Sequence, residues 1–347
     1  MSQFGAKAAA ELRGASDTMP VDPQARNEPV KRPPAKPGQM ETDQVNATAV
    51  VEVVNGMLDE YESGRQLLGI STGYPSLDEI LGGWQRSRLY VVGARTRTGK
   101  SVFALNSALR VASAKEPVAY LTPEMPAKHQ FKRALYCWAQ VPEYRVRHHT
   151  MGPGHWGRMV DAANNIARMN LVFDENPRPT IDQVETKLRA FRAQGVRLAF
   201  LDHGLRLAVT GRQTIRESVV DRMVRFKALV NELDMSLVVL WQLTRECDSR
   251  QVKDHRPHLT DLQESGSVEQ EADCVILLHR ADMLREAEEW DNKIDLIVAK
   301  HRDGQPGTVT LNFDGPMTHI SEPSGSDLGI PATNPASYHE TERDAGL

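Results

Sequence analysis

The sequence predicts an α/β fold with a twisted, mainly parallel sheet flanked by helices. Short apolar runs rich in β-branched residues alternate with longer stretches of helical hydrophobic periodicity, as in repeated strand and helix units. Several of these runs end in a polar or acidic residue, which is where parallel sheets place their chemistry. One run, over 89–92, leads into a turn ending in Gly99, Lys100 and Ser101, and then into an apolar helical pattern.

The stretch from Leu89 to Ser101 has the strand, loop and helix order of a Walker A phosphate-binding motif. Backbone N–H groups of such a loop and of the following helix cradle phosphate oxygens. We expect Lys100 to reach the β- and γ-phosphates of ATP, and the Ser101 hydroxyl to bind Mg²⁺. The residues expected to bind the nucleotide are Ala94, Arg95, Thr96, Arg97, Thr98, Gly99, Lys100 and Ser101.

The composition excludes several classes of protein. The formal net charge of −4 gives no global basic signature, so a nucleic-acid surface must be local. The three cysteines are widely spaced, which argues against a disulfide framework and against a cysteine zinc site. No segment approaches the ~20 apolar residues of a membrane span, and the first residues lack an apolar signal segment. We therefore expect a cytoplasmic protein with no membrane partner.

The chain divides into four predicted regions. Residues 1–44 are polar and rich in proline, which predicts a disordered tail. Residues 45–68 carry one apolar stripe at helical spacing, which predicts an amphipathic linker helix that packs on its own domain or on a neighbouring subunit. Residues 69–320 are predicted to form the main domain, in which Ser76 caps a short helix. Residues 321–347 are polar and predict a second disordered tail.

The elements after the phosphate loop are predicted from their periodicity and turn signals. We expect strands over 117–121, 171–173, 197–202, 236–241, 274–278 and 291–299, with 307–313 as the last strand. We expect helices over 128–140, 156–169, 181–194 and 216–233, the third of them capped by Thr180. Residues 205–213 and 246–257 are predicted loops, and 260–270 are predicted to form short turns.

Three polar residues follow predicted strands. Glu124 lies just past 117–121, where it either orients or deprotonates an attacking water, or serves as a first-turn glutamate favoured by the helix dipole. Asp202 ends an apolar strand in the Walker B pattern, which provides an acid beside Mg²⁺. Gln242 follows the next strand, where a polar side chain can sense the γ-phosphate.

In this order, the motifs resemble the C-terminal motor domain of DnaB-type replicative helicases, within the RecA-like P-loop ATPases. The resemblance runs from about Gly69 to Gly315 and rests on segments 69–78, 82–83, 94–101, 124–125, 262–273 and 299–304. The family's own Walker A begins with Ala-Arg, which accounts for Ala94 in place of the first glycine. The chain departs from the family at Gln263, where arginine is frequent, and at His203, where tyrosine is usual. The residues before 69 are too few and too polar for the family's N-terminal helical domain, which meets primase.

The resemblance implies an ATP-dependent hexameric helicase that moves on single-stranded DNA and unwinds duplex DNA in replication, with a primase or helicase loader as further partner. It implies that Lys300 and Arg302 reach the γ-phosphate of the adjacent subunit. The residues implied in catalysis are Lys100, Glu124, Asp202, Gln242, Lys300 and Arg302, with Ser101 and Asp202 at the metal. The residues expected to contact DNA are Arg206, Arg212, Arg245, Gln263, Glu264, Ser265 and Gly266.

Two other functions fit parts of the pattern. One is a recombinase of the RecA or RadA type, which coats DNA as a filament without unwinding it. The other is an ATP-gated DNA-binding or loading module with little turnover. The Glu264-Ser265-Gly266 segment and the Lys300-to-Gly304 segment favour the helicase over the recombinase, and the complete set of catalytic residues favours it over the loading module.

Overall fold

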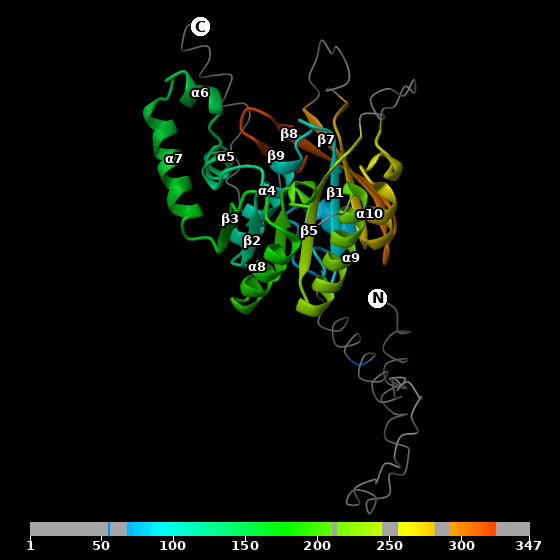
Figure 1. Cartoon of the computed structure of the whole chain (residues 1–347). Coiled ribbons are helices and arrows are strands. Elements are labelled where there is room, and N and C mark those ends of the chain that lie inside the picture. Colours follow the sequence, from blue (N-terminus) through cyan, green and yellow to red (C-terminus); the bar gives the residue numbers. More distant parts are fainter. Residues whose placement is uncertain (1–54, 56–67, 210–213, 245–255, 282–291, 324–347) are drawn as a thin grey trace, which may run out of the picture. The chain divides into compact units, whose positions relative to one another are not determined.

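The computed structural model describes residues 55, 68–209, 214–244, 256–281 and 292–323 (Figure 1). The chain separates into two compact units, Met1–Gln66 and Leu67–Leu347. In the first unit only Asn55 is described, and it is helical. The predicted tail over 1–44 and most of the predicted linker helix over 45–68 therefore lie outside the described residues. The architecture below is that of the second unit.

The strands of the second unit's described part form one sheet in the order β3-β2-β4-β5-β1-β6-β7-β8-β9. Their bounds are β1 Leu89–Ala94, β2 Val118–Leu121, β3 Leu171–Asp174, β4 Leu198–Leu201, β5 Ser236–Gln242, β6 Cys274–His279, β7 Lys293–His301, β8 Gly307–Asp314 and β9 His319–Ser321. All pairs from β3 to β6 are parallel, and β7, β8 and β9 continue the sheet antiparallel. This confirms the predicted mainly parallel sheet.

Helices cover both faces of the sheet (Figure 1). The α-helices are α3 Pro75–Leu81, α4 Lys100–Ser113, α5 Ala127–Ala139, α6 Glu143–Arg147, α7 Pro153–Ile166, α8 Ile181–Ala193, α9 Ile215–Leu233 and α10 Ser265–Glu271. The described residues also form two 3₁₀ turns, η2 Gly204–Arg206 and η4 Leu259–Asp261. Among the described helices, none has the length and apolar character needed to cross a membrane.

Two apolar cores lie on the two faces of the sheet. Alternation along each strand divides the side chains between them, so that Tyr90 and Val92 face one core while Leu89 and Val91 face the other. The first core includes α3, α4, α5 and α7, and the second includes α8, α9 and α10. Because both faces are covered, the central strands are uniformly buried.

Three local predictions are wrong, each for a physical reason. Residues 265–271 form helix α10 instead of short turns, because Val268 and Ala272, four residues apart, bury one helical face. The last strand is β9, not 307–313. Its sequence is polar apart from the buried Ile320, which pairs with Phe313 of β8. Ser76 does not cap α3, because Pro75 at the first helical position makes Tyr74 the N-cap residue.

The boundary of the predicted C-terminal tail also shifts. Ser321 belongs to β9, and the buried carboxylate of Glu322 accepts hydrogen bonds from the backbone N–H and the hydroxyl of Ser76, at 3.0 and 2.7 Å. The first residues of the predicted tail therefore join the end of the sheet to the start of α3. Residues 324–347 lie outside the described residues.

The buried side chains of the sheet are expected to contribute strongly to the free energy of unfolding. Leu277 in β6 is fully buried, so Leu277→Ala is expected to lower the free energy of unfolding by about 2–5 kcal/mol, measured by urea denaturation. Val160→Ala on α7, where the side chain is 57% exposed, is the control and should change it by about 0.5 kcal/mol or less. Equal effects of the two substitutions would contradict the assignment of the core.

Candidate functional site

The phosphate loop joins β1 directly to α4. Gly99 is the N-cap residue of α4 and has a φ of +113°, a conformation that side-chain-bearing residues rarely adopt. A Cβ atom at this position would lie 2.8 Å from Cε2 of Phe313. The loop therefore turns closely against β8. An α-helix has no intrahelical partners for its first N–H groups, so the start of α4 can supply donors to an anion.

A cavity of about 350 Å³ opens beside this loop. It is lined by Arg95, Thr96, Arg97, Gly99, Lys100, Ser101, Val102, Glu124, Met125, Arg133, Asp202, His203, Gln242 and Phe313. Two residues predicted to bind nucleotide are not in this lining: Ala94 is buried at the end of β1, and the N–H of the buried Thr98 closes the loop onto the carbonyl of Arg95. Their contribution is to the shape of the loop.

Four strands bring the predicted catalytic side chains to this cavity. The phosphate loop follows β1, Gln242 ends β5, Asp202 follows β4 and Glu124 follows β2. Since these strands are adjacent and parallel, their carboxyl ends meet at one edge of the sheet. Residues that are far apart in the sequence are thereby brought together, as the sequence predicts.

Lys100 points from the first turn of α4 to the tip of β5. Its ammonium donates a hydrogen bond of 3.0 Å to the backbone carbonyl of Trp241. Burial lowers the pKa of Lys100 to about 8, and the neighbouring carboxylates of Asp202 and Glu124 oppose this shift. A cation in such surroundings is suited to accept a polyanion such as a triphosphate.

Ser101 and Asp202 form a donor set that fits a magnesium ion. Asp202 is almost fully buried, accepts hydrogen bonds from Ser101 and from the Tyr120 hydroxyl, and has a pKa raised by its burial. Among the described residues, no group of three acidic, histidine or cysteine side chains surrounds the position. Mg²⁺ bound to nucleotide needs only one or two protein oxygens, because phosphates and water supply the others.

Glu124 is held between two nitrogen donors. Its Oε2 lies 3.0 Å from Nε2 of His203, and its Oε1 accepts a 2.9 Å hydrogen bond from the Arg206 guanidinium. The pKa of His203 is lowered to about 4 by burial and by Lys100, so the imidazole is neutral near pH 7. Its Nε2–H donates the hydrogen bond to Glu124. The Asp202–His203 peptide bond is cis.

Gln242 connects the phosphate loop to the segment before α10. Its side-chain amide donates to the Thr96 hydroxyl at 3.3 Å, and its backbone carbonyl accepts from the N–H of Gln263 at 3.2 Å. The indole N–H of Trp241 donates to the carbonyl of Gln263 at 2.7 Å. A movement of Thr96 in the phosphate loop would therefore be transmitted through Gln242 to Gln263.

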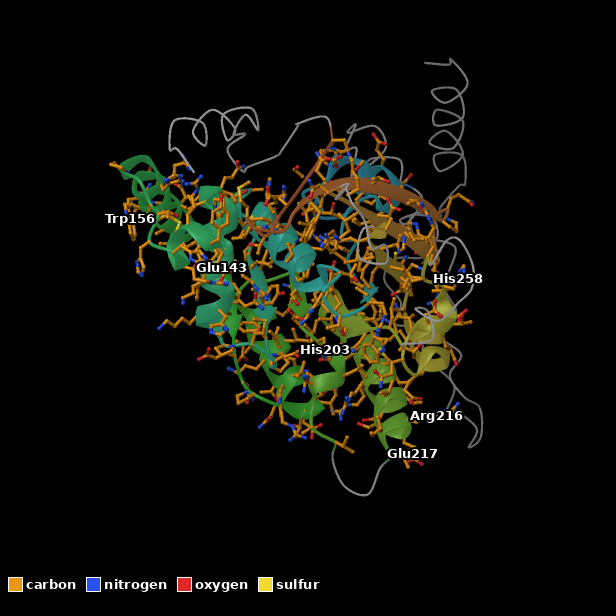
Figure 2. All side chains as sticks on the ribbon, turned by 90° about the horizontal axis from the view of Figure 1, so that it is seen from above. Glu143, Trp156, His203, Arg216, Glu217 and His258 are labelled. Carbon is orange, nitrogen blue, oxygen red and sulfur yellow. The ribbon has the colours of Figure 1, made fainter. Side chains whose placement is uncertain are left out.

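The predicted DNA-contacting residues follow strands at the same edge. Arg206 ends the turn η2 after β4, and Gln263, Glu264 and Gly266 lie around the start of α10. Glu264 also lies 3.9 Å from Arg216 at the start of α9. Figure 2, seen from above, labels His203 near the middle of this view, with Arg216 to one side. Arg212, Arg245 and the side chain of Ser265 lie outside the described part.

Lys300 and Arg302 lie at the opposite edge of the sheet. β7 runs antiparallel to β6, so His301 pairs with Cys274 at the start of β6. The strand rise places this edge about 20 Å from the phosphate loop. The ammonium of Lys300 donates to the carbonyls of Glu269 and Ala272, and the half-exposed Arg302 pairs with Asp273 at 3.1 Å.

Asp273 forms ion pairs with three basic side chains at this opposite edge. Its side chain is 3% exposed and contacts Lys227 at 2.7 Å, Arg302 at 3.1 Å and Arg88 at 3.8 Å. One of its oxygens also accepts from the N–H of Leu89, the first residue of β1. The predicted γ-phosphate contacts of Lys300 and Arg302 thus cannot be made to the loop of the same chain.

Several residues of the site have no predicted role in the sequence. The sequence pattern places Trp241 only in a strand, yet it contacts Lys100, Gln263 and the turn η2. Phe313 and Arg133 line the cavity from β8 and α5. Neither has a motif around it, and only the fold brings it to the loop. His203 stands out in the sequence solely as a departure from the family pattern.

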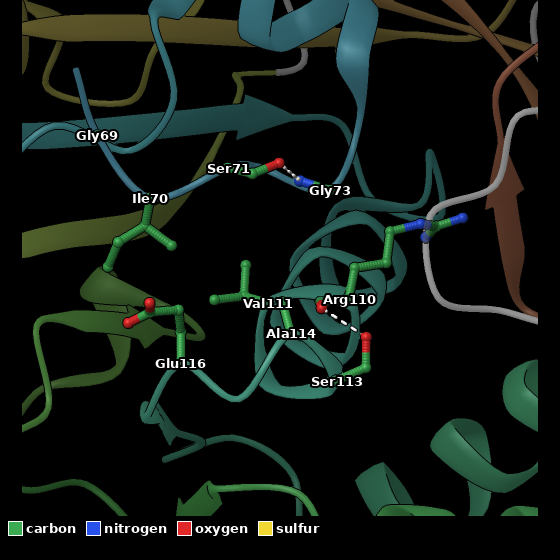
Figure 3. Close-up of a pocket in the computed structure, with 9 residues that line it drawn as sticks. All are labelled: Gly69, Ile70, Ser71, Gly73, Arg110, Val111, Ser113, Ala114 and Glu116. Carbon is green, nitrogen blue, oxygen red and sulfur yellow. Dashed lines mark hydrogen bonds between the residues drawn. The ribbon is translucent and has the colours of Figure 1, made fainter. Parts of the chain in front are cut away.

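A larger cavity, of about 520 Å³, lies at the other end of α4 (Figure 3). It is formed by segment 69–73, the last turn of α4 and Glu116. Ser71 and Ser113, whose hydroxyls could meet a ligand, are already hydrogen-bonded to the backbone N–H of Gly73 and the carbonyl of Arg110. It contains none of the residues predicted for catalysis.

Comparison with known proteins gives consistent matches. The family model of the DnaB-like helicase C-terminal domain matches residues 69–322. The replicative DNA helicase DnaB of Geobacillus stearothermophilus is 34% identical over 252 residues, which are 72% of this chain and 55% of that protein. The replicative DNA helicase DnaC of Bacillus subtilis is 32% identical over 279 residues, which are 77% and 61% of the two chains. The chain thus spans little more than half the length of these relatives.

Solved structures agree with these matches. One, described as an ATPase domain, superposes with a TM-score of 0.75 at 26% identity, covering 80% of this chain and 99% of that one. A DnaB-like replicative helicase, described together with its interactions with primase, superposes with a TM-score of 0.73 at 27% identity. That match covers 78% of this chain and 66% of the other. Both support the RecA-like α/β fold.

The lowered pKa of Lys100 predicts how nucleotide affinity depends on pH. A bound triphosphate favours the protonated amine, so above pH 8 binding requires proton uptake, and the affinity should fall up to about tenfold per pH unit. The measurement is the dissociation constant of a fluorescent ATP analogue between pH 7.5 and 9.5. Lys100→Arg, whose guanidinium stays charged, should bind with no such slope. A flat profile for the unsubstituted protein would contradict the prediction.

Proposed function

Since this chain belongs to the family of DnaB-like helicase C-terminal domains, we propose that it is the ATP-driven motor of a ring-shaped DNA helicase. The ring moves along single-stranded DNA and unwinds duplex DNA during replication. The relatives named above are replicative helicases, which favours this function over the recombinase and the loading module. The domain that carries the activity is the one predicted over 69–320, with its C-terminal boundary extended to Glu322.

One observation carries the proposal. The side chains needed to hydrolyse ATP meet around one cavity of about 350 Å³, except for Lys300 and Arg302, which lie at the opposite sheet edge. The phosphate loop lies at one edge of the sheet, and Lys300 and Arg302 lie at the other. One chain can therefore complete its site only when a second copy supplies these two cations. Such contacts are head-to-tail, and they form a ring when the rotation between neighbouring copies closes.

Within one site, the chain's own residues divide the work. Lys100 moves from the Trp241 carbonyl to the phosphates, and Ser101 and Asp202 hold Mg²⁺, which offsets phosphate charge when bound. Glu124 orients the attacking water or accepts its proton. Phe313 and Arg133 close the wall of the cavity from β8 and α5.

The second half of the site comes from the neighbouring subunit. Arg302 is about half exposed, so its guanidinium can turn from Asp273 toward a phosphate presented by another copy. Lys300 is held by backbone carbonyls, and its pKa is lowered chiefly by burial. An arginine supplied in trans is worth a factor of about 10³–10⁵ in rate.

DNA is proposed to bind near Arg206 and the start of α10. Gln242 donates a hydrogen bond to Thr96 and accepts one from the backbone N–H of Gln263, and these two bonds provide a short path from the phosphate loop to this surface. Contacts to the phosphate backbone make such binding strongly dependent on salt. A primase or a helicase-loading protein is the further partner class, by analogy with the structural relative described with primase.

Two substitutions test the shared site. Lys100→Ala removes the phosphate contact and Arg302→Ala removes the contact in trans, so each should lower DNA-stimulated ATP hydrolysis at least about 100-fold and abolish fork unwinding. Mixing the two variants should restore part of the rate. With random assembly about a quarter of the interfaces join an intact loop to an intact Arg302.

The matched control is a mixture of Lys100→Ala with the double variant that lacks both residues. No interface in that mixture is complete, so its rate should stay at background. Recovery only in the first mixture supports a site made by two subunits. An Arg302→Ala protein with the unsubstituted rate, or a first mixture without recovery, would show that Arg302 does not act across the interface.

A further inference from the structure

Both carboxylate oxygens of Glu124 already have partners, and these partners differ in kind. His203 is 7% exposed in its side chain and contacts Oε2, whereas Arg206 is 55% exposed and contacts Oε1. The ion pair to Arg206 is thus the one that solvent and other anions can reach. Exposed ion pairs contribute little to stability and exchange partners readily.

The backbone that carries Arg206 is firmly held. The buried Arg222 of α9 donates to the carbonyls of Gly204 and Leu207, at 3.3 and 2.9 Å, on either side of Arg206. A Cβ on Gly204 would lie 2.5 Å from the ring of Trp241, so the turn packs directly on that ring. Only the side chain of Arg206 is left to move.

His203 is fixed in a donor role. Its Nδ1 is buried and has no hydrogen-bond partner among the described residues, so only Nε2 makes a polar contact, and that contact is with Glu124. An imidazole in this state holds one oxygen of the carboxylate and leaves the other to Arg206.

We propose that Arg206 is a latch on Glu124: without DNA it holds Oε1, and a phosphate of single-stranded DNA draws the guanidinium away, freeing that oxygen to orient the attacking water. His203 is the positioning residue that keeps Glu124 in place when the latch opens. The inference rests on the proposed function, and it links DNA binding to hydrolysis through one side chain instead of a moving backbone.

The chemistry favours this exchange. A guanidinium binds a carboxylate and a phosphate with the same planar donor geometry, so a DNA phosphate can replace Glu124 without leaving the cation unpaired. Glu124 keeps the hydrogen bond from His203 and stays beside Lys100 and Asp202. The device therefore needs only a rotation of an exposed side chain.

The test compares ATP hydrolysis of the unsubstituted chain and Arg206→Ala, with and without oligo-dT. The latch predicts that Arg206→Ala raises the DNA-independent rate by a factor of about 5 or more, while stimulation by oligo-dT falls toward 1. Arg189→Ala is the matched control, because it breaks another exposed arginine–glutamate pair, to Glu232 on helix α9. It should leave both rates unchanged.

His203 is tested by substitution with Leu and Gln. His203→Leu should lower kcat both with and without oligo-dT and leave KM unchanged, because it loosens Glu124 but not the nucleotide. His203→Gln, whose amide can replace the Nε2 donor, should restore most of the rate. A rise in KM with kcat intact in His203→Leu would overturn the positioning role.

The outcomes separate the two proposals. Suppose that oligo-dT stimulates the unsubstituted chain, and that Arg206→Ala keeps the low DNA-independent rate but needs a higher oligo-dT concentration for the same stimulation. Arg206 is then a DNA contact only, and the latch is wrong. A lower basal rate in Arg206→Ala also overturns it, because Arg206 would then support Glu124. If the unsubstituted chain hydrolyses ATP with no response to DNA, the proposed function itself fails, and the latch with it.

Discussion

The parallel pairing of β2, β4, β5 and β1 is the constraint on which the rest of the site depends. It sends the carboxyl ends of β2, β4, β5 and β1 to one edge of the sheet, where the phosphate loop, Glu124, Asp202 and Gln242 surround one cavity. The antiparallel return through β7 has the opposite effect, because it delivers Arg302 to the edge where β1 begins. The sheet thereby places the phosphate loop and Arg302 at opposite edges, and the proposed role of a second subunit follows from this separation.

Trp241 contacts three segments at the edge of the cavity: the phosphate loop, the segment before α10 and the turn η2. Its carbonyl holds Lys100, its indole N–H holds the Gln263 carbonyl, and its ring supports the turn that carries Arg206. The proposed nucleotide-binding and DNA-binding surfaces thus both contact one buried residue at the tip of β5. Such a rigid support leaves movement to side chains and to the short segment at Gln263, which is the arrangement expected where binding at one surface alters chemistry at the other.

The sequence was sufficient for the fold class, for most strands and for the loop around Lys100, because strong periodicity and a strand–loop–helix order are local signals. It failed for α10 and β9, whose few buried residues, Val268 and Ile320 among them, are too sparse to show a period. It also missed Trp241 and Phe313, because their roles arise from which strands lie side by side, and no local pattern encodes that. The ion pair between Arg206 and Glu124 joins positions 82 apart, so it too appears only in the fold.

The most direct test of the shared site is the ATP turnover per chain measured against protein concentration, with the assembly state followed by mass photometry in the same samples. If Arg302 completes a neighbour's site, turnover per chain should be near background for separated chains and rise in parallel with the fraction in rings. A turnover per chain that stays constant from separated chains to rings would contradict the account, because the site at the carboxyl edge would then be complete in one copy.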